Sequence, residues 1–515
     1  MHPPISRSLV VLVGAAWALS AGCGGGGGNH ASIPVYSAWT SYGGNAQHSA
    51  LSDAATQDLV KIHWSRPVDL LPPYTGTILY IHYGSPVITQ ANTVIFPVKT
   101  GLAGGFRFDA VAGDTGASLW SMPTDYELPP HGWVPSVTGC LAPSRRLYVP
   151  GGGGTLLYRD DADAVASPAV RVAFFGDAAY AANPAAFNGS VFINTPLTSD
   201  DAGNVYFGVQ VTGANPASVT SSLVKITKDG VSTAIPVPTY ASDMLKVTHN
   251  CAPALSPDGA TLYVNVNATN GAGGSAGYLV AVRTSDLVLV QKVRLTDPTS
   301  AIDAFVDDDG TASPTVGPDG DVYVGVLENP LGPNHYRGWL LHFNAGLTLT
   351  KIPAAFGWDD TASIVPASMV PTYVGASAYL LMIKYNNYAE AGGDGVNKLA
   401  IVDPNASAVE SVSGYAAMKE VLTVAGVTPD ADFVATHPGA VREWCINTAA
   451  VSPATNSILC NNEDGTCYRW NLVTNTLDQK VVLAPATGEA YTPTVIGPDG
   501  TVYAINNAVL NAIGR

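Results

Sequence analysis

A strand-turn-strand pattern recurs along the chain. In its clearest copy, Ser313 to Val326, a proline opens an apolar run, Gly317 to Gly320 supply a Gly-Pro-Asp-Gly turn, and Asp321 to Val326 alternate between apolar and small or polar positions. Proline is tolerated at the start of a strand, and Pro-Asp-Gly closes a tight turn. The pattern therefore predicts a pair of antiparallel strands.

Eight copies of this hairpin follow one another, with starts 45 to 82 residues apart. This spacing fits four-stranded propeller blades separated by variable loops. We therefore predict an all-β fold, an eight-bladed β-propeller of four-stranded antiparallel blades, with seven blades as the alternative. Tyr415 to Val424 is predicted as the one helix. The copies begin at Pro86, Pro135, Pro196, Pro253, Pro314, Pro366, Thr448 and Pro493.

The last copy is incomplete. Thr492 to Gly514 has room for three short strands but not for a fourth. Because an open edge strand invites aggregation, a closed ring needs a fourth strand from elsewhere. The alternating segment Lys61 to Val68 is the natural donor, so we expect the two ends of the domain to meet.

The N-terminus has the pattern of an export signal. Arg7 precedes an apolar run, Leu9 to Leu19, that is too short for a permanent transmembrane helix. Leu19 to Cys23 resembles a bacterial lipobox, in which the cysteine is acylated, and a plain secretory signal is the alternative. We predict a signal peptide at 1–22, a lipidated Cys23 with a glycine-rich tether at 23–37, and one propeller domain at 38–515. Gly24 after the cysteine points, by resemblance, to the outer membrane.

Charge narrows the range of partners. The chain carries 24 Lys and Arg against 40 Asp and Glu, a net charge of −16, and only 12% of its residues are charged. Nucleic acids and anionic lipid surfaces favour clustered basic residues. We therefore expect no nucleic-acid partner, and contact with a membrane only through the lipid anchor.

Two segments carry a resemblance to a known family. The first, Ala38 to Val68, contains Trp39, Gly43, Gly44, Asn45, His48 and Lys61 to Trp64, and the second is FDAVAGDTGASLW, Phe108 to Trp120. They resemble the opening segment and the Ala-x-Asp-x-x-Thr-Gly-x-x-x-Trp repeat of quinoprotein-like, PQQ-repeat β-propellers. In that family the opening segment supplies the outermost strand of the last blade. We interpret Trp120 as a residue that docks one blade on the next.

The resemblance also raises the question of cofactors. PQQ-dependent dehydrogenases of this kind carry two adjacent cysteines, a tryptophan floor, and Asp, Glu and Asn ligands to calcium. No two cysteines are adjacent here, so we predict no bound PQQ. Calcium stays an alternative, because Asp307 to Gly310 resembles half of a calcium loop as well as a solvated turn.

Cys23 is followed by five further cysteines, an odd number. Cys460 and Cys467 flank the turn of the seventh hairpin, so a cross-strand disulfide between them is a candidate. Two reduced core residues are the alternative. The pairing of Cys140, Cys251 and Cys445 is left undecided.

The loops divide by face. Turns between first and second strands are mostly of the Pro-Asp-Gly kind, whereas the loops that enter each blade, and those between second and third strands, are long. Long loops on one side of a rigid scaffold concentrate binding residues. The candidate binding residues in the entering loops are His82, Tyr83, His131, Trp133, His249, Asn250, Asp307, Asp308, Asp309, Trp358, Asp359, Asp360, His437, Arg442, Glu443 and Trp444.

Each type of candidate has a structural alternative. The tryptophans could serve packing alone. The histidines belong to several blades and need not share a metal, so no metal site is predicted. Asp359 and Asp360 could do acid or base work beside Asp307 only if blades five and six bring them within reach.

Three functions of different class remain. The first is an outer-envelope lipoprotein whose propeller is a non-enzymatic binding or scaffold module for an envelope protein or glycan. The second is an enzyme, either a degenerate quinoprotein oxidoreductase or a propeller lyase or hydrolase, with its site at the channel mouth. The third is a small-molecule or metal sensor. Fold alone does not choose between them.

Overall fold

A computed structural model gives the arrangement of most of the chain. It describes residues 38–515 except 77, 78, 80, 82, 132–136, 270–273, 311 and 485–492. The predicted signal peptide, Cys23 and the tether lie outside the described residues, as do His82 and Trp133 of the candidate binding residues.

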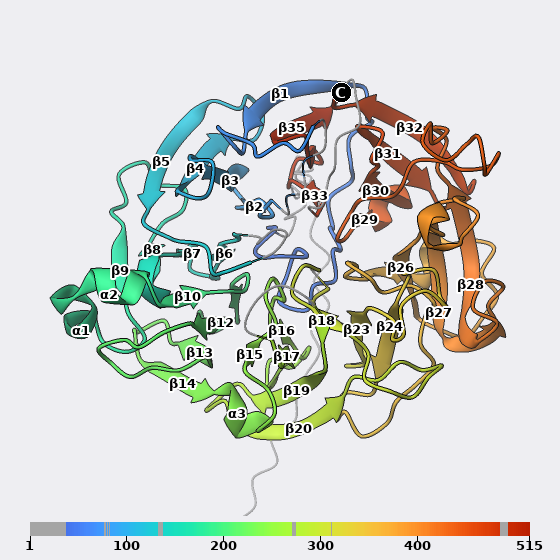
Figure 1. Ribbon diagram of the computed structural model, residues 1–515. Helices are drawn as coiled ribbons and strands as arrows, with labels where there is room; N and C mark the ends of the chain where they lie inside the picture. Colours follow the sequence, from blue (N-terminus) through green and yellow to red (C-terminus); the bar gives the residue numbers. More distant parts are fainter. Residues whose placement is uncertain are drawn as a thin grey trace, which may run out of the picture. The chain divides into compact units, whose positions relative to one another are not determined.

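Eight antiparallel sheets are arranged around a central channel (Figure 1), which confirms the predicted eight-bladed propeller. Strand order within blades 1 to 7 follows the chain, from the channel outward. Blade 1 contains β2 (Val87–Ile88), β3 (Thr93–Lys99), β4 (Phe106–Ala112) and β5 (Ser118–Thr124), and blade 2 contains β6 (Cys140–Leu141), β7 (Leu147–Pro150), β8 (Leu156–Arg159) and β9 (Val170–Val172). Blade 3 contains β10 (Val191–Ile193), β11 (Thr198–Ser199), β12 (Val205–Val211), β13 (Ser222–Ile226) and β14 (Ser232–Pro236). Blade 4 contains β15 (Lys246–Val247), β16 (Ala254–Leu255), β17 (Thr261–Asn267), β19 (Gly277–Arg283) and β20 (Leu289–Arg294).

The other four blades complete the ring. An extra pair, β18 (Gly274–Ser275) with β21 (Val306–Asp307), joins blade 4 to blade 5. Blade 5 contains β22 (Thr315–Val316), β23 (Val322–Val326) and β24 (Trp339–Phe343), and blade 6 contains β25 (Ser363–Pro366), β26 (Tyr379–Tyr385), β27 (Lys398–Val409) and β28 (Ala416–Ala425). Blade 7 contains β29 (Ala450–Ser452), β30 (Ser457–Asn461), β31 (Thr466–Asn471) and β32 (Thr476–Val482). Blade 8 contains β33 (Val495–Ile496), β34 (Val502–Asn506), β35 (Val509–Gly514) and β1 (Lys61–Pro67).

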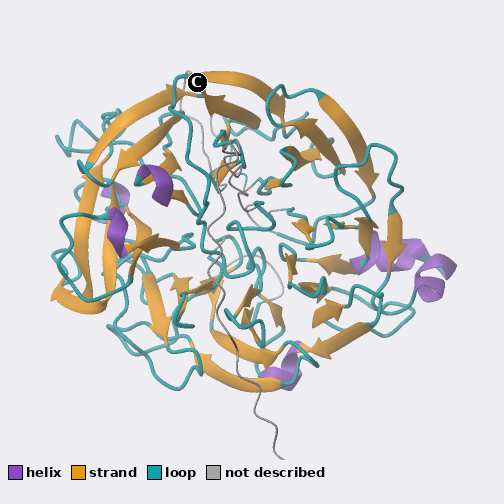
Figure 2. Ribbon diagram, turned by 180° about the vertical axis from the view of Figure 1, so that it is seen from behind, coloured by secondary structure: helices purple, strands orange, loops and turns teal. Residues whose placement is uncertain are grey.

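Helices are few and short, as the view from behind also shows (Figure 2). None of those among the described residues is long and apolar enough to cross a bilayer. They are α1 (Asp177–Ala182), α2 (Pro184–Asn188), α3 (Val237–Tyr240) and the 3-10 turns η1 (Gly152–Gly154), η2 (Ala367–Met369), η3 (Ala389–Ala391) and η4 (Pro453–Thr455).

The recurring hairpin forms the inner part of each blade. In blade 5, Thr315 pairs with Tyr323 and Val316 with Val322. Gly320 closes the turn with a positive φ of 86°, a conformation that suits glycine. In blade 6 the inner strand ends at Pro366, although the sequence predicts that it begins there.

A tyrosine in the second strand of several blades reaches the neighbouring blade. The Tyr263 hydroxyl donates to the Ala345 carbonyl at 2.7 Å, and the Tyr503 hydroxyl donates to the Gly113 carbonyl at 3.2 Å. The apolar-Tyr-apolar triplet of the repeat thus links successive blades as well as filling the core between them.

The predicted closing strand is confirmed. β1 pairs antiparallel with β35, from Lys61 opposite Gly514 to Pro67 opposite Val509, and supplies the outermost strand of blade 8. The two ends of the domain therefore lie side by side at the top of Figure 1.

Tryptophans in outermost strands dock on the next blade, as predicted for Trp120. Its indole N–H donates to the Ala162 carbonyl at 2.8 Å, in the turn between the third and fourth strands of blade 2, and the Arg159 guanidinium lies 3.9 Å from its ring centre. Trp64 of β1 makes the matching bond to the Gly113 carbonyl of blade 1 at 2.8 Å.

The segment Trp39–Gln57, which we call the plug, lies across the channel instead of joining a blade. Its backbone exchanges hydrogen bonds with the backbone of seven of the eight blades, including Trp39 with Ile88 at 2.8 and 3.0 Å and Leu141 N–H with the Thr40 carbonyl at 2.8 Å. The remaining partners are Leu255, Val316, Ile364 and Val451 in first strands and Gly500 in the turn of blade 8.

Plug side chains hold this course. Gly43 has a φ of +63°, and a Cβ there would lie 2.8 Å from the Cβ of His48. The Pro314 carbonyl can only accept a hydrogen bond, so His48 Nδ1, 2.7 Å away, carries the proton and donates. Burial lowers the pKa of His48 to about 4.

Two local predictions are corrected. The predicted helix Tyr415 to Val424 is instead strand β28, the outermost strand of blade 6, which is paired along its length with β27. The candidate disulfide between Cys460 and Cys467 does not form, and the alternative of two reduced core residues applies. Cys460 lies opposite Tyr468 and Cys467 opposite Asn461, so the two thiols are on opposite faces of the sheet and both are buried and reduced.

Candidate functional site

The propeller has two faces, which differ in the connections that they carry. The turn face carries the turns between first and second strands and between third and fourth strands. The loop face carries the loops between second and third strands and the loops that lead from one blade into the next. The fourteen described residues among the sixteen candidates lie in loops of the loop face or directly beside them.

Eight of these candidates gather where blades 4, 5 and 6 meet the channel. In blade 4 the innermost strand is divided into β15 and β16, both paired with β17, and Asn250 between them has a positive φ of 62°. Asp359, in the segment that leads into blade 6, has a φ of 50°. The group consists of His249, Asn250, Asp307, Asp308, Asp309, Trp358, Asp359 and Asp360.

A buried ion pair fixes blade 4 to blade 5. Lys246 Nζ lies 2.6 Å from Asp308 Oδ1, with the two side chains 0% and 4% exposed. Asp308 also accepts hydrogen bonds from the backbone N–H of His249 at 2.9 Å and from the Asn267 amide at 2.9 Å. Burial lowers the pKa of Lys246 and raises that of Asp308, and each charge counteracts the shift in the other. Asp308 is therefore a structural residue.

Asp307 and Asp359 differ from Asp308 in lining a cavity. Trp358 lies at the same cavity, against Gly310, where an added Cβ would be 3.4 Å from its ring. The cavity is small, about 10 Å³, which is room for roughly one water-sized particle. Burial, with the neighbouring carboxylates of Asp309, Asp308 and Asp359, raises the pKa of Asp307 to about 6.

Two further polar side chains border this cavity. Thr248 Oγ1 and Asn265 Oδ1 are buried, and neither has a hydrogen-bond partner among the described residues. A buried polar atom left without a partner costs roughly 1–3 kcal/mol, so such atoms in a native protein call for an explanation. A bound group that donates hydrogen bonds or carries positive charge would satisfy both atoms and the two carboxylates.

The third blade of the site contributes a second lysine. Lys384 Nζ lies 3.8 Å from Asp359 Oδ2, and the Asn447 amide donates to Asp359 Oδ1 at 3.1 Å. The Lys384 backbone N–H donates to Asp360 at 3.1 Å. Burial raises the pKa of Asp360 to about 8, so its carboxyl is protonated at neutral pH and is a poor ligand for a cation.

The remaining candidates lie elsewhere on the loop face. The Tyr83 hydroxyl donates to Asp69 at 2.9 Å in blade 1, and Asp69 is paired with Lys99 at 2.9 Å. His131 is exposed beside a separate cavity of about 750 Å³ at blades 1 to 3. Neither residue reaches the cavity between blades 4 and 6.

Blade 7 holds the last four candidates, in two roles. Arg442 Nη1 lies 3.1 Å from Asp430 and 3.0 Å from Asp432, so it holds its own loop, and the backbone N–H of Glu443 donates to Glu463 at 3.2 Å. His437 is half-buried, and its Nδ1 lies 3.0 Å from the Thr436 hydroxyl. Trp444 is completely buried in the core between blades 6 and 7, which matches the packing role that the sequence leaves as its alternative.

Four residues of the site were not predicted from the sequence: Lys246, Thr248, Asn265 and Lys384. A signal is present for Asn265, because it interrupts the apolar second strand of blade 4, TLYVNVN, at a fully buried position. A polar residue inside a buried strand requires a partner or a ligand. No comparable pattern marks Thr248, which is one of many threonines in loops.

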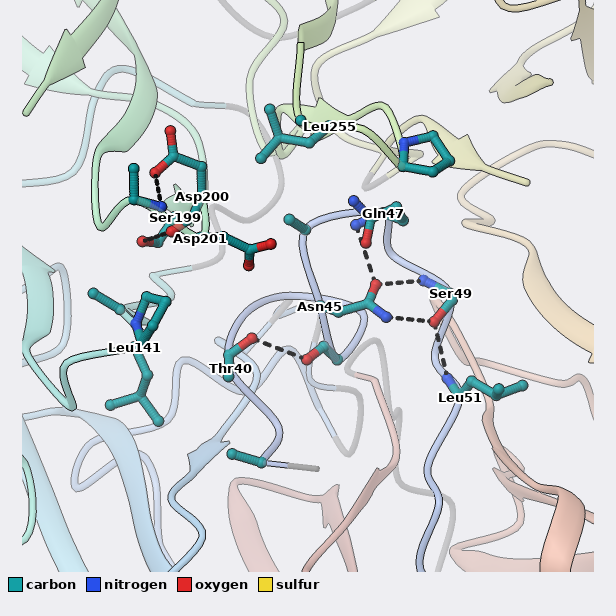
Figure 3. A pocket seen from close by; sticks show the side chains of 18 of the residues that line it. Thr40, Asn45, Gln47, Ser49, Leu51, Leu141, Ser199, Asp200, Asp201 and Leu255 are labelled. Carbon is teal, nitrogen blue, oxygen red and sulfur yellow. Dashed lines mark hydrogen bonds between the residues drawn. The ribbon is translucent and has the colours of Figure 1, made fainter. Parts of the chain in front are cut away.

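A cavity of about 750 Å³, much larger than the one between blades 4 and 6, opens on the turn face (Figure 3). It lies between the plug and the turns of blades 1 to 4, and Ala38, Thr40, Asn45 and Gln47 border it from the plug side. The polar groups here are already used within the protein. Asn45 bonds to Ser49 at 2.7 Å, and Gln47 donates to the Ser256 carbonyl at 3.3 Å.

Comparisons with known proteins bear on the fold. A methanol dehydrogenase containing europium matches 91% of this chain and 89% of its own, with 10% identity and a TM-score of 0.55. The quinohemoprotein alcohol dehydrogenase of Comamonas testosteroni matches 93% and 77%, with 12% identity and a TM-score of 0.51. The Dos1 propeller matches 88% and 94%, with 10% identity and a TM-score of 0.52.

The likeness is one of fold. These dehydrogenases are PQQ-repeat-like propellers, so the fold that the sequence resemblance implies is confirmed. At such low identity the likeness transfers neither activity nor cofactor. No family model and no curated protein matches the chain.

Two groups bound by PQQ-dependent dehydrogenases, PQQ and calcium, can be compared with the residues of this site. A tricyclic quinone with three carboxylates does not fit the cavity between blades 4 and 6, which has room for about one water-sized particle and is bordered by two carboxylates. The buried lysines there are already paired with Asp308 and Asp359.

A single hard cation fits this cavity better. Asp307, Asp359, Asn265 Oδ1 and Thr248 Oγ1 are the oxygen ligands that calcium prefers. In the described part of the chain, no three His, Cys, Asp or Glu side chains are grouped so that they could hold a metal ion. Any cation would therefore rely on two carboxylates and two neutral oxygens.

Proposed function

We propose that this protein is a lipid-anchored protein of the bacterial cell envelope whose propeller is a non-enzymatic binding module. Its ligand, an envelope protein or a glycan, binds the loop face where blades 4, 5 and 6 meet. The anchor is Cys23, on the basis of its lipobox-like sequence, and the outer membrane is the expected location on the basis of Gly24.

One observation carries the binding site. Thr248 Oγ1 and Asn265 Oδ1 are buried without a partner beside the carboxylates of Asp307 and Asp359 and the ring of Trp358. The rigid hydrogen-bonded segments of blades 4 to 6 hold these groups in place before any ligand arrives, which limits the entropy lost on binding. A ligand that offers hydroxyl or ammonium groups matches these unpartnered acceptors, the two carboxylates and the aromatic ring.

The chemistry of the site favours binding over catalysis. Asp308 and Asp360 are committed to structural contacts with Lys246 and with the Lys384 backbone. Asp307 is the one carboxyl of the site whose raised pKa, about 6, would suit acid or base work near neutral pH. Among the described residues, no Ser, Cys or Lys side chain lines the cavity, and the one hydroxyl among its lining residues is that of Thr248.

The test is a comparison of variants. The wild type, Trp358→Ala and Asp307→Asn are each used to capture ligands from solubilised envelopes and from cell-wall glycan fractions. We expect each substitution to lower recovery of the main ligand by about tenfold or more, which corresponds to roughly 1.4 kcal/mol or more. The readout is quantitative mass spectrometry or glycan analysis of the eluates.

Val374→Ala on the turn face is the matched control, because Val374 is fully in solvent and should leave capture unchanged. Equal recovery by all variants would remove blades 4 to 6 from the binding hypothesis. Dye-linked dehydrogenase activity after addition of PQQ and calcium would instead support the enzyme alternative.

A further inference from the structure

The described part of the chain begins at the centre of the turn face. Ala38 borders the turn-face cavity together with the turns of blades 1 to 4 (Figure 3), and Trp39, the next residue, is held by two backbone hydrogen bonds to Ile88 in the innermost strand of blade 1. Ala38 is thus the point at which residues 24–37 join the described part of the chain.

Their reach is limited. The 14 residues between Cys23 and Ala38 allow these two residues to lie at most about 54 Å apart when fully extended. As a flexible glycine-rich coil their root-mean-square span is roughly 20 Å. A lipid on Cys23 therefore holds the middle of the turn face close to the bilayer.

The path from Ala38 to the loop face is much longer than the root-mean-square span of the tether. A compact domain of this size has a radius of gyration of about 23 Å and hence a radius of roughly 30 Å. To bring the loop face to the bilayer, the tether would have to run from the channel to the rim and then along the side of a blade. A seven-residue strand such as β3 or β17 adds roughly 23 Å to that path. The whole path, roughly 53 Å, equals the length of the fully extended tether and is more than twice its root-mean-square span, so this orientation would require a fully stretched tether.

We propose that the turn face is the membrane-proximal face of the anchored protein, and that the loop face points away from the bilayer. This inference rests on the proposed lipid anchor at Cys23. It implies that the ligand of the loop-face site approaches from the aqueous side, as a protein segment or glycan outside the membrane and not as a lipid.

Charge on the turn face agrees with a face that is tethered near the bilayer without inserting into it. Asp53, Asp201 and Asp258 border the central cavity there, with Arg145 already paired with Asp161 at 3.0 Å. Acidic side chains are repelled by anionic headgroups, so the rim of this cavity favours tethering near such a surface over insertion into it.

The experiment measures the distance of each face from a membrane. Val374→Cys, in the turn between β25 and β26, and Glu390→Cys, in the loop between β26 and β27, place a dye on opposite faces of the same blade. Both positions are exposed, whereas Cys140, Cys251, Cys445, Cys460 and Cys467 are buried and react slowly. Each full-length, acylated variant is inserted into phosphatidylethanolamine–phosphatidylglycerol vesicles that contain an acceptor-labelled lipid.

We expect energy transfer to the lipid acceptor to be at least about twofold more efficient from position 374 than from position 390. Equal transfer, or stronger transfer from position 390, would overturn the orientation. A Cys23→Ala version of each variant separates this failure from failure of the anchor. If the Cys23→Ala protein floats with the vesicles as well as its parent does, the proposed lipid anchor is overturned, and the orientation with it.

Discussion

Gly116 lies where the outermost strand of blade 8 meets blade 1. Its φ is +66°, and a Cβ on it would be 2.6 Å from Cγ of Trp64. Trp64 in turn donates its indole N–H to the Gly113 carbonyl. The glycine of the repeat motif is thus required for contact with the preceding blade, while Trp120 of the same motif reaches the following one.

Gly116→Ala should therefore destabilise the protein. We expect a loss of about 2–4 kcal/mol in the free energy of unfolding, from the strained backbone and from overpacking against Trp64. Urea unfolding followed by circular dichroism measures the loss.

Gly414→Ala is the matched control, because Gly414 has the same φ of +66° but open space around it. It should lose only the backbone part, about 1 kcal/mol. Equal losses for the two variants would contradict the docking role of Gly116.

The sequence pattern is informative at single residues only where the chemistry is local. The role of Trp120 could be predicted because the repeat motif itself contains the docking pair. Cys460 and Cys467 could not be assigned from spacing, because a one-residue offset in register puts the two thiols on opposite faces of the sheet. Thr248 and Asn265 matter because their buried oxygen atoms have no hydrogen-bond partner among the described residues, and no local sequence pattern predicts this.

Among the elements, β1 has the largest consequence for the ring. It covers the edge of β35, and its alternate residues Ile62 and Trp64 pack against the core of blades 8 and 1, while Lys61, His63 and Ser65 face solvent. This alternation allowed the closing strand to be predicted. The same kind of pattern failed for β28, because its Ala, Met, Lys, Glu and Leu residues favour a helix when the edge of β27 is left out of account.

Ile62→Asp should release β1 from β35. We expect a loss of roughly 2–4 kcal/mol in stability, from burying a charge against the core, and the appearance of oligomers through the exposed edge of β35. Light scattering after size-exclusion chromatography detects the oligomers.

His63→Asp, one position along and facing solvent, should stay monomeric and within about 0.5 kcal/mol of the wild type. A monomeric and stable Ile62→Asp variant would show that the ring does not depend on this strand for closure.

At the scale of the whole molecule, the plug joins blades that are far apart in sequence. The resemblance to PQQ-repeat propellers pointed to the segment from Ala38 to Val68, yet only its second part forms the expected strand. The course of Trp39–Gln57 could not be predicted, since its partners are backbone groups of seven blades and such bonds leave no mark on side-chain patterns.

The buried His48 makes the plug sensitive to acid. Its pKa in the folded protein, about 4, lies below the value near 6.5 of an exposed histidine. The folded state therefore binds fewer protons than the unfolded state between these values, so its stability is complete above pH 6.5 and falls as the pH drops toward 4. The expected loss from this group is about 1 kcal/mol per pH unit.

His48→Asn should remove this dependence. Asparagine suits the φ of +57° at this position and can donate to the Pro314 carbonyl in place of Nδ1. Melting temperatures of the two proteins should converge as the pH falls from 6.5 to 4, because only the wild type loses the histidine contribution. A constant difference over this range would contradict the assignment.

The plug also constrains the order of events in folding. Trp39–Gln57 precedes every blade in the chain, so it emerges first during synthesis or export, yet its bonds require strands that end with blade 8. Contacts over such separations form slowly, because the loop they close must first lose its entropy. Until the last blade has left the ribosome or translocon, both the channel and the edge that β1 later covers remain open. For this chain, the period before closure is the one in which a chaperone would be needed.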